Sequence, residues 1–150
     1  MQAHAIHPDV SQATGAPRFA RPDLNSLHLN SGAMAAWRQA YATLGAQAAA
    51  SVGGDFAVTL ETAAGGTYLA VDRFAIHTLC YRIQGGRLRF ASRADDLADN
   101  GDGTRAEIDP QAIYDYLFFH VVPSPRTVFK GIYRLPPGHF ALFKDNKLAI

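Results

Sequence analysis

Cysteine is nearly absent from this 150-residue sequence, in which Cys80 is the single thiol. One cysteine excludes an internal disulfide and is typical of a cytoplasmic protein. The N-terminus also lacks the apolar core of a signal peptide, because His4, His7, Pro8 and Asp9 interrupt it. No apolar run approaches the length that spans a membrane. We therefore expect a cytoplasmic protein with no membrane partner.

A strong charge of either sign is missing as well. The formal net charge is +1, from 14 basic and 13 acidic residues. Because nucleic acids and anionic membranes attract strongly basic surfaces, this balance predicts neither as a partner. The length and the 48% hydrophobic content fit one domain with a core of its own.

The patterns that hold metals and phosphates are missing too. Six histidines occur, at His4, His7, His28, His77, His120 and His139, but no pair has the H-x-x-x-H spacing of a metal site. Each glycine pair fits a turn, and none belongs to a phosphate loop that ends in Lys-Ser or Lys-Thr. We therefore predict no metal and no cofactor bound by this chain.

What the sequence does contain is a series of β-rich runs between residues 53 and 92. These runs are Asp55–Leu60, Thr67–Val71, Leu79–Ile83 and Arg87–Ala91. Glycine-containing breaks separate the first run from the second and the third from the fourth, which is typical of hairpins. We predict a four-stranded antiparallel meander, packed with helices in an α+β fold.

Two helices are expected beside this meander. Apolar residues at 3–4 spacing predict one near Ser31–Ala49, and Asp109 followed by proline predicts the start of another at Pro110–His120. Phe140–Phe143 and Leu148–Ile150 are expected to pair. Residues 1–29 show no clear period and are interpreted as an irregular segment with at most a short strand at Ser26–Leu29, which leaves residues 30–150 as the domain.

Several blocks occur in one order along the chain: D-F-A-V-T-L, Y-L-A-V-D-R-F-A-I-H-T-L-C-Y, L-R-F-A-S, I-D-P and T-V-F-K-G-I-Y-R-L-P-P-G-H. Together, over Trp37–Ala141, this series resembles the amidotransferase half of the glutamine-hydrolysing asparagine synthetases. The resemblance implies part of an α/β/β/α sandwich of the Ntn-hydrolase type.

The resemblance implies a catalytic cysteine directly after the initiator methionine, whose own α-amine takes the thiol proton. This chain instead begins Met1-Gln2-Ala3, and Cys80 lies within the meander, where it is interpreted as a buried packing residue. The family's S-D-T-E segment, whose aspartate holds glutamine, falls at residues 32–35, which contain no carboxylate. Arg21-Pro22-Asp23 only partly resembles the family's R-G-P-D. We therefore predict no catalytic and no substrate-binding residue in this chain.

The charged pair Asp72-Arg73 and the segment Pro137-Gly138-His139 are predicted to be structural motifs. Asp72 ends a strand and enters a tight turn, where its carboxylate can accept backbone N–H bonds. A substrate role for Asp72 is the alternative. The aromatic residues Tyr116, Phe118 and Phe119 are expected in the core or against a neighbouring domain.

Three hypotheses for function follow. The first is a non-catalytic N-terminal domain of an asparagine-synthetase-like amide ligase, in which a downstream synthetase domain would use ATP and Mg²⁺. The resemblance extends to β-lactam synthetases and lasso-peptide cyclases, whose glutaminase domains are inactive, and the missing N-terminal cysteine fits that branch. The second is a stand-alone interaction or regulatory module. The third is an active glutaminase with an unrecognised nucleophile.

A partner is expected because the meander carries more apolar positions than the chain can cover. These positions are Phe56, Val58, Leu60, Tyr68, Ala70, Leu79, Tyr81, Leu88 and Phe90. One helix layer covers one face of a sheet, and soluble domains seldom expose large apolar patches. We therefore expect the uncovered face, or the P-P-G-H segment and C-terminal hairpin beside it, to pack against a synthetase domain or a second copy of the chain.

Overall fold

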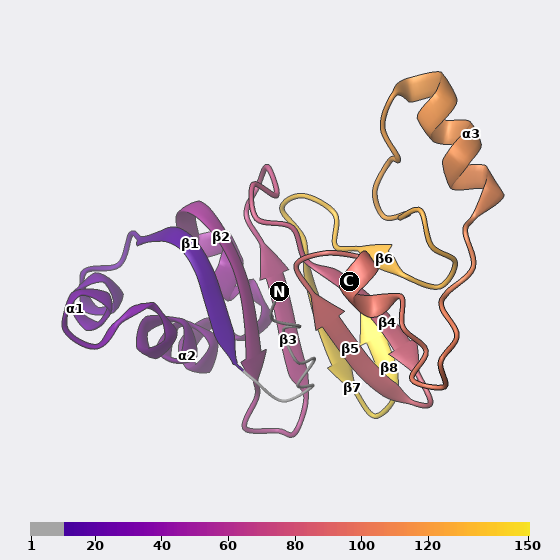
Figure 1. Cartoon of the computed structure of the whole chain (residues 1–150). Coiled ribbons are helices and arrows are strands. Elements are labelled where there is room, and N and C mark those ends of the chain that lie inside the picture. The colour runs from indigo at the N-terminus through magenta and orange to yellow at the C-terminus, as the bar shows by residue number, and fades with distance from the viewer. Residues whose placement is uncertain (1–10) are drawn as a thin grey trace. The chain divides into compact units, whose positions relative to one another are not determined.

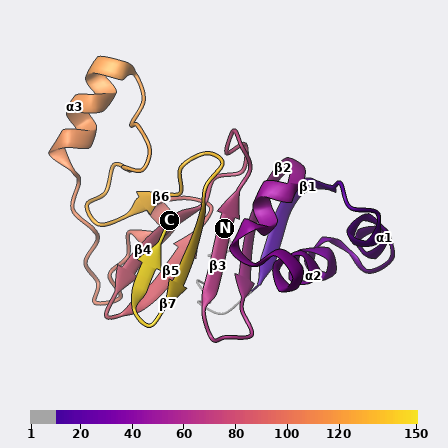
Figure 2. The ribbon, with the colours of Figure 1, turned by 180° about the vertical axis from the view of Figure 1, so that it is seen from behind.

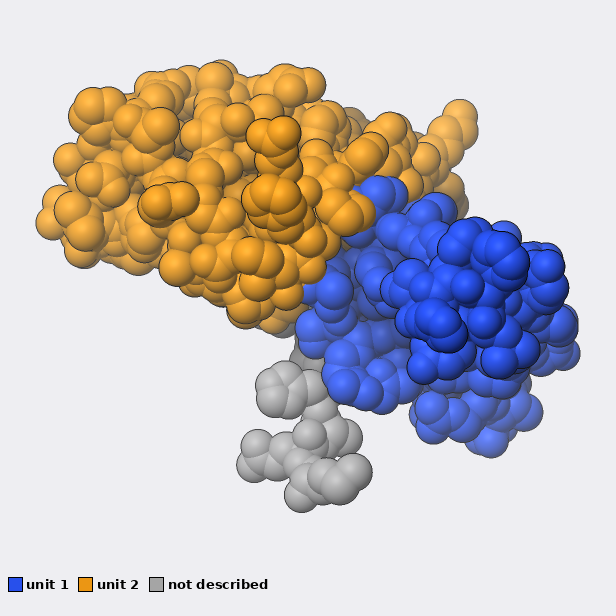
Figure 3. All heavy atoms as spheres, turned by 90° about the horizontal axis from the view of Figure 1, so that it is seen from above, with its two compact units in different colours: residues 1–8, 78–136 blue, residues 9–77, 137–150 orange. Residues whose placement is uncertain are grey.

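The computed structural model describes residues 11–150, which form two compact units (Figure 3). Unit 2 contains residues 11–77 and 137–150, and unit 1 contains residues 78–136. The division was not expected, since the sequence shows no linker between two domains. The chain enters unit 1 at Thr78 and leaves it at Pro136, so a continuous segment is inserted into unit 2.

Unit 2 is built on a five-stranded antiparallel sheet with the order β1-β2-β3-β7-β8 (Figure 1). The strands are β1 (Gln12–Phe19), β2 (Val52–Glu61), β3 (Thr67–Val71), β7 (Phe140–Lys144) and β8 (Lys147–Ala149). The expected C-terminal hairpin is confirmed, because β7 pairs with β8 across Asp145 and Asn146. Both turn residues have positive φ, as tight hairpin turns require.

The helices of unit 2 are α1 (Pro22–Ser31), α2 (Ala33–Leu44) and the 3₁₀ segment η1 (Gly45–Ser51). Figure 2 shows α2 beside β1 and β2. The 3–4 spacing of apolar residues in α2 turns Trp37 and Ala40 inward, and both are fully buried with Phe56 and Val58 of β2. This face of the sheet and its helices form the main core of the unit.

Unit 1 contains a three-stranded antiparallel sheet with the order β5-β4-β6. Its elements are β4 (Cys80–Gln84), β5 (Arg87–Ala91), the 3₁₀ turn η2 (Asp95–Leu97), α3 (Pro110–Phe119) and β6 (Tyr133–Arg134). Gly85 and Gly86 both have positive φ and close the predicted β4–β5 hairpin. A small core of Cys80, Leu97, Ala98 and Ile132 lies under the sheet.

The structure confirms the α+β fold class and both hairpins, but the single meander is wrong. Strand β3 pairs with β7, and β4 pairs with β6, so the second and third runs are not neighbours. The physical reason is the link between them: Asp72 binds the backbone of the following turn, and this turn does not fold back as a hairpin.

Three further expectations are corrected. Residues 11–29, interpreted as irregular, contain β1, which pairs with β2 along its whole length, and most of α1. The short strand expected at Ser26–Leu29 is wrong, because these residues are helical within α1. The nine meander positions expected to need cover are all buried within the chain. The helix at Pro110–Phe119, expected to supply part of that cover, instead exposes its own apolar side chains.

No helix among the described residues is long and apolar enough to cross a membrane.

Candidate functional site

The residues singled out at the end of β3 form a tightly bonded turn, which we call the Asp72 turn (residues 72–77). Asp72 is only 2% exposed. Its carboxylate accepts N–H bonds from Phe74 at 2.8 Å, Ile76 at 3.1 Å and Phe56 at 3.2 Å. Three backbone donors satisfy a buried carboxylate and hold the turn against β2. The backbone bonds predicted for Asp72 are therefore present.

The Pro137–His139 segment lies directly against this turn. The backbone N–H of Gly138 donates to the Asp72 carbonyl at 2.8 Å, and the Val71 N–H donates to the His139 carbonyl at 3.2 Å. A Cβ added to Gly138, which has a φ of +70°, would contact the backbone of Arg73 at 3.5 Å. The sequence motif therefore joins the end of β3 to the start of β7, as a structural role requires.

A carboxylate–imidazole pair lies next to the Asp72 turn. His77 Nε2 lies 2.9 Å from Asp55 Oδ2, and both side chains are about one-third exposed. The hydrogen bond from His77 is the largest cause that lowers the pKa of Asp55 below its ordinary value. Gly15 of β1 allows this approach, because a Cβ there would lie 2.7 Å from His77 Cδ2 and 2.4 Å from the Asp55 carbonyl oxygen.

The Asp55–His77 pair can accept and release a proton, but the described residues offer no hydrogen-bonded nucleophile for it to activate. A carboxylate–imidazole pair serves nucleophilic catalysis only when the imidazole reaches a hydroxyl or thiol. Among residues 11–150, the structure shows no hydroxyl or thiol hydrogen-bonded to the His77 ring. The Asp72 carboxylate is taken up by its own turn. The pair therefore links β2 to the Asp72 turn.

Cys80 lies in β4 of unit 1 and is 3% exposed. Burial is the largest effect on its thiol and raises its pKa, although Arg134 opposes the shift. A thiol that is neither exposed nor ionised is a poor nucleophile. The interpretation of Cys80 as a packing residue agrees with its place in the unit 1 core.

The remaining candidate residues do not assemble into a pocket. Arg21 and Asp23 bond to each other at 2.7 Å on the surface of α1. Residues 32–35 form the junction of α1 with α2, where Gly32 has a φ of +87°. His139 is exposed and bonds locally to the Pro137 carbonyl. Gln2, His4 and His7 lie outside the described residues.

One pocket of about 630 Å³ opens in unit 1, between the first turns of α3 and residues 123–133. Its charged groups are paired with one another. Arg126 contacts Asp109 at 2.8 Å and Asp115 at 3.4 Å, and Lys130 contacts Glu107 at 2.6 Å. Within residues 11–150, no group of three His, Cys, Asp or Glu side chains could hold a metal ion.

The sequence interpretation missed the pair of Asp55 with His77 and the role of Gly15. His77 is 22 positions from Asp55, and Gly15 is 40 positions from it. No local spacing in the sequence therefore indicates that the three residues meet. The one available signal was that Asp55 is a charged residue within a strand whose following residues are mostly apolar. Its carboxylate needed a partner, and the sequence alone did not name one.

Comparison with known proteins supplies the family. A family model described as a glutamine amidotransferase domain matches residues 36–150. The chain belongs to the class II glutamine amidotransferase domain family.

Among curated proteins, this amidotransferase domain is similar to those named putative asparagine synthetase [glutamine-hydrolyzing] from Mycobacterium bovis and from two strains of Mycobacterium tuberculosis. Each is 33% identical over 99 residues, which is 64% of this chain. The matched region spans only 15% of the length of these relatives. The family expectation is confirmed, and the Asp72 turn and Pro137–His139 segment both lie within the matched residues.

Proposed function

We propose that this amidotransferase domain is the non-catalytic, glutaminase-like part of an ATP-dependent amide-forming ligase. Family membership and the names of the curated relatives support an origin in glutamine-dependent amide synthesis. The main support for a loss of glutaminase activity is the environment of Cys80. This residue is the single cysteine of the chain, and it is buried with a raised pKa. The family's chemistry needs an accessible thiolate.

The candidate site supports the same proposal. A class II glutaminase must hold the charged ends of glutamine and attack its side-chain amide. Asp72 is used within its own turn, and Asp55 is paired with His77. In this proposal the motif residues Asp72 and Pro137–His139 hold the scaffold together. ATP and Mg²⁺ are assigned to a synthetase domain, and a cytoplasmic location stays a prediction.

An ammonia-release assay with glutamine tests the loss of activity. The purified chain should give no turnover above buffer, and Cys80→Ala should match it. Turnover that disappears in Cys80→Ala would identify Cys80 as a nucleophile and contradict the proposal. Turnover that persists in Cys80→Ala would indicate a hydroxyl nucleophile and contradict it equally.

The ligase part of the proposal has a separate test. Sequencing the parent reading frame and its neighbours should find a synthetase domain, and the complete protein should form pyrophosphate from ATP with a carboxylate substrate. A protein without any synthetase domain would favour an interaction or regulatory module, for which the exposed helix α3 is the supporting observation.

A further inference from the structure

Helix α3 exposes most of its apolar side chains. Leu117 is 71% exposed, Phe118 is 69% exposed and Tyr114 is 62% exposed. We call the six residues Ile113, Tyr114, Tyr116, Leu117, Phe118 and Phe119 the α3 surface. Figure 1 shows α3 projecting away from the strands of its own unit. Single exposed apolar residues are common in proteins, but a contiguous group of this size marks an interaction site.

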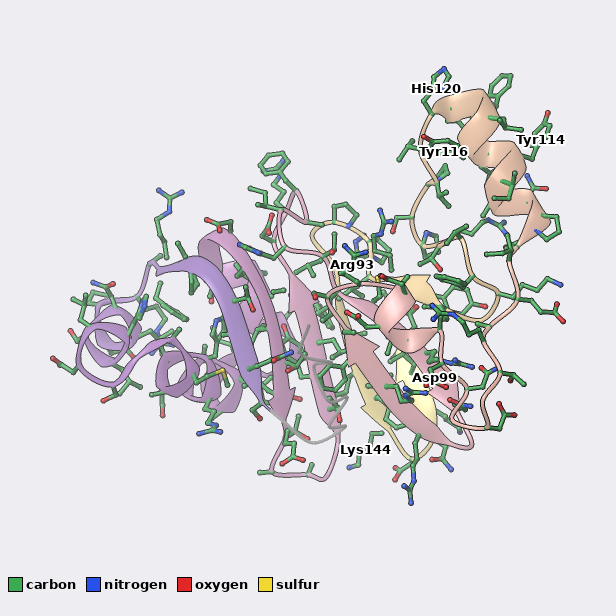
Figure 4. All side chains as sticks on the ribbon, in the orientation of Figure 1. Arg93, Asp99, Tyr114, Tyr116, His120 and Lys144 are labelled. Carbon is green, nitrogen blue, oxygen red and sulfur yellow. The ribbon has the colours of Figure 1, made fainter. Side chains whose placement is uncertain are left out.

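The α3 surface extends around the helix and is not confined to one stripe. Successive residues are about 100° apart on a helix, so these six positions cover more than half of its circumference. Figure 4 shows Tyr114 and Tyr116 on opposite sides of the helix. Of the other residues on the helix, Ala112 is buried and Asp115 contacts Arg126. Helices that are apolar on most sides are usually enclosed by other parts of a protein.

The base of α3 is held in place although its apolar residues are free. Asp109 caps the helix by accepting the N–H of Gln111 at 3.0 Å, and it also binds Arg126. Gln111 bonds to Asp115 one turn later at 2.7 Å. These contacts orient the helix before any partner binds, which reduces the ordering cost of association.

We propose that the α3 surface inserts into an apolar groove of a synthetase-type domain. This inference rests on the proposed function. A symmetric pair of two α3 helices would cover one side of each and leave the other aromatic residues in water, whereas a groove encloses several sides. The matched region of the curated relatives is 15% of their length, so such proteins contain ample further polypeptide to form the groove.

Charge also favours a polypeptide as the occupant. The α3 surface contains no charged residue, and the pocket at its base has its cations paired with carboxylates. A nucleotide or other anion would meet no free cation among these residues. Interface cores are depleted of charge and rich in aromatic residues, as this surface is.

Photo-crosslinking in the source cells tests the proposal. A benzoylphenylalanine replaces Tyr114 or Leu117 in the complete natural protein, and the crosslinked peptides are sequenced by mass spectrometry. The matched control is Gln39, an exposed residue of α2. We expect Tyr114 and Leu117 to crosslink to peptides of an ATP-using synthetase domain, and Gln39 not to do so. Crosslinks to a second copy, to a different protein, or at the level of Gln39 would overturn the proposal.

A charge-insertion variant gives a second measurement. Leu117→Lys combined with Phe118→Lys keeps residues of good helix propensity, and circular dichroism should show an unchanged fold. Crosslinking from Tyr114 should fall by about tenfold, because charge is buried at an apolar contact. An unchanged yield would overturn the proposed docking.

The experiments distinguish a failure of the proposed docking from a failure of the proposed function. If the complete protein adenylates a carboxylate but α3 crosslinks elsewhere, the proposed function stands and the docking surface is wrong. If no synthetase domain accompanies the chain, both proposals are wrong.

Discussion

Helices α2 and α3 show that forming a helix and burying it have separate causes. Helix α2 has no side-chain hydrogen bond at its N-cap and no acidic residue in its first turn. Its inward residues Trp37 and Ala40 are nevertheless completely buried. Helix α3 differs in its cap and in its burial, because the Asp109 side chain caps it while Tyr114 and Leu117 remain exposed.

The two helices therefore depend on different parts of the molecule. Packing against a sheet stabilises α2, as it does most helices in proteins. Local contacts at its first turn stabilise α3, and its apolar side chains add little because they are exposed to solvent.

The largest effect is expected at Trp37. Trp37→Ala removes a fully buried ring that contacts Phe19 and Phe56, and should lower the free energy of unfolding by about 3–5 kcal/mol. Urea denaturation measures the loss. Trp37→Phe is the matched control, since it keeps most of the ring and removes a buried indole N–H without a partner. If Trp37→Ala costs less than Trp37→Phe, α2 is not held by packing.

A smaller effect is expected at Gly15, where β1 approaches the Asp72 turn. Gly15→Ala places a Cβ within 2.4 Å of the Asp55 carbonyl oxygen, whereas Gly32→Ala places one in open space. Both glycines have positive φ, so the two substitutions share the cost of the backbone conformation. Gly15→Ala should be less stable than Gly32→Ala by about 1–3 kcal/mol in urea denaturation. Equal losses would show that the close contact is unimportant.

The stability of helix α3 should depend on its N-terminal cap and not on packing. Asp109→Ala removes the acceptor of the Gln111 N–H and the partner of Arg126. The amides of α3 should exchange with solvent several-fold faster, while those of α2 in the same sample keep their rates. Faster exchange in both helices would mean that α3 is coupled to the main core.

Acid should weaken α3 through the same residue. The hydrogen bond from Arg126 is the largest cause that lowers the pKa of Asp109 below its ordinary value of 3.8, although burial opposes it. A carboxyl whose pKa is lower in the folded state stabilises the fold above pH 3.8, and this contribution is lost as the pH falls through the lowered value. Cα chemical shifts of α3 should report this loss, and Asp109→Asn should remove the dependence. The opposite sign would contradict the ion pair.

The smallest effect is expected on the exposed side of α3. Leu117→Ser should change the free energy of unfolding of the 150-residue chain by no more than about 0.5 kcal/mol, since the side chain is 71% exposed. Urea denaturation beside Trp37→Ala makes the comparison direct. A loss above 2 kcal/mol would show that α3 is packed within this chain.

Much of the local structure was predictable. The hairpin turn at Gly85-Gly86, the cap at Asp109 and the bonds from Phe74 and Ile76 to Asp72 all involve residues within a few positions of one another. The sequence motifs of the family could be recognised for a similar reason, because each is a short segment with fixed spacing. The segment before residue 30 was misinterpreted because β1 contains Gly15 and Pro17, which weaken a strand signal.

The arrangement of strands and the exposure of α3 were decided by tertiary structure alone. Tyr68 of β3 lies opposite Leu142 of β7, 74 positions away, and Asp55 meets His77 across a turn. Choices between distant partners depend on which surfaces remain uncovered after the hairpins form, and a linear pattern of apolar residues does not encode them. The sequence by itself determined the turns, the caps and the family. Only the folded chain decided that the meander is two sheets, and that α2 is buried while the apolar side chains of α3 are exposed.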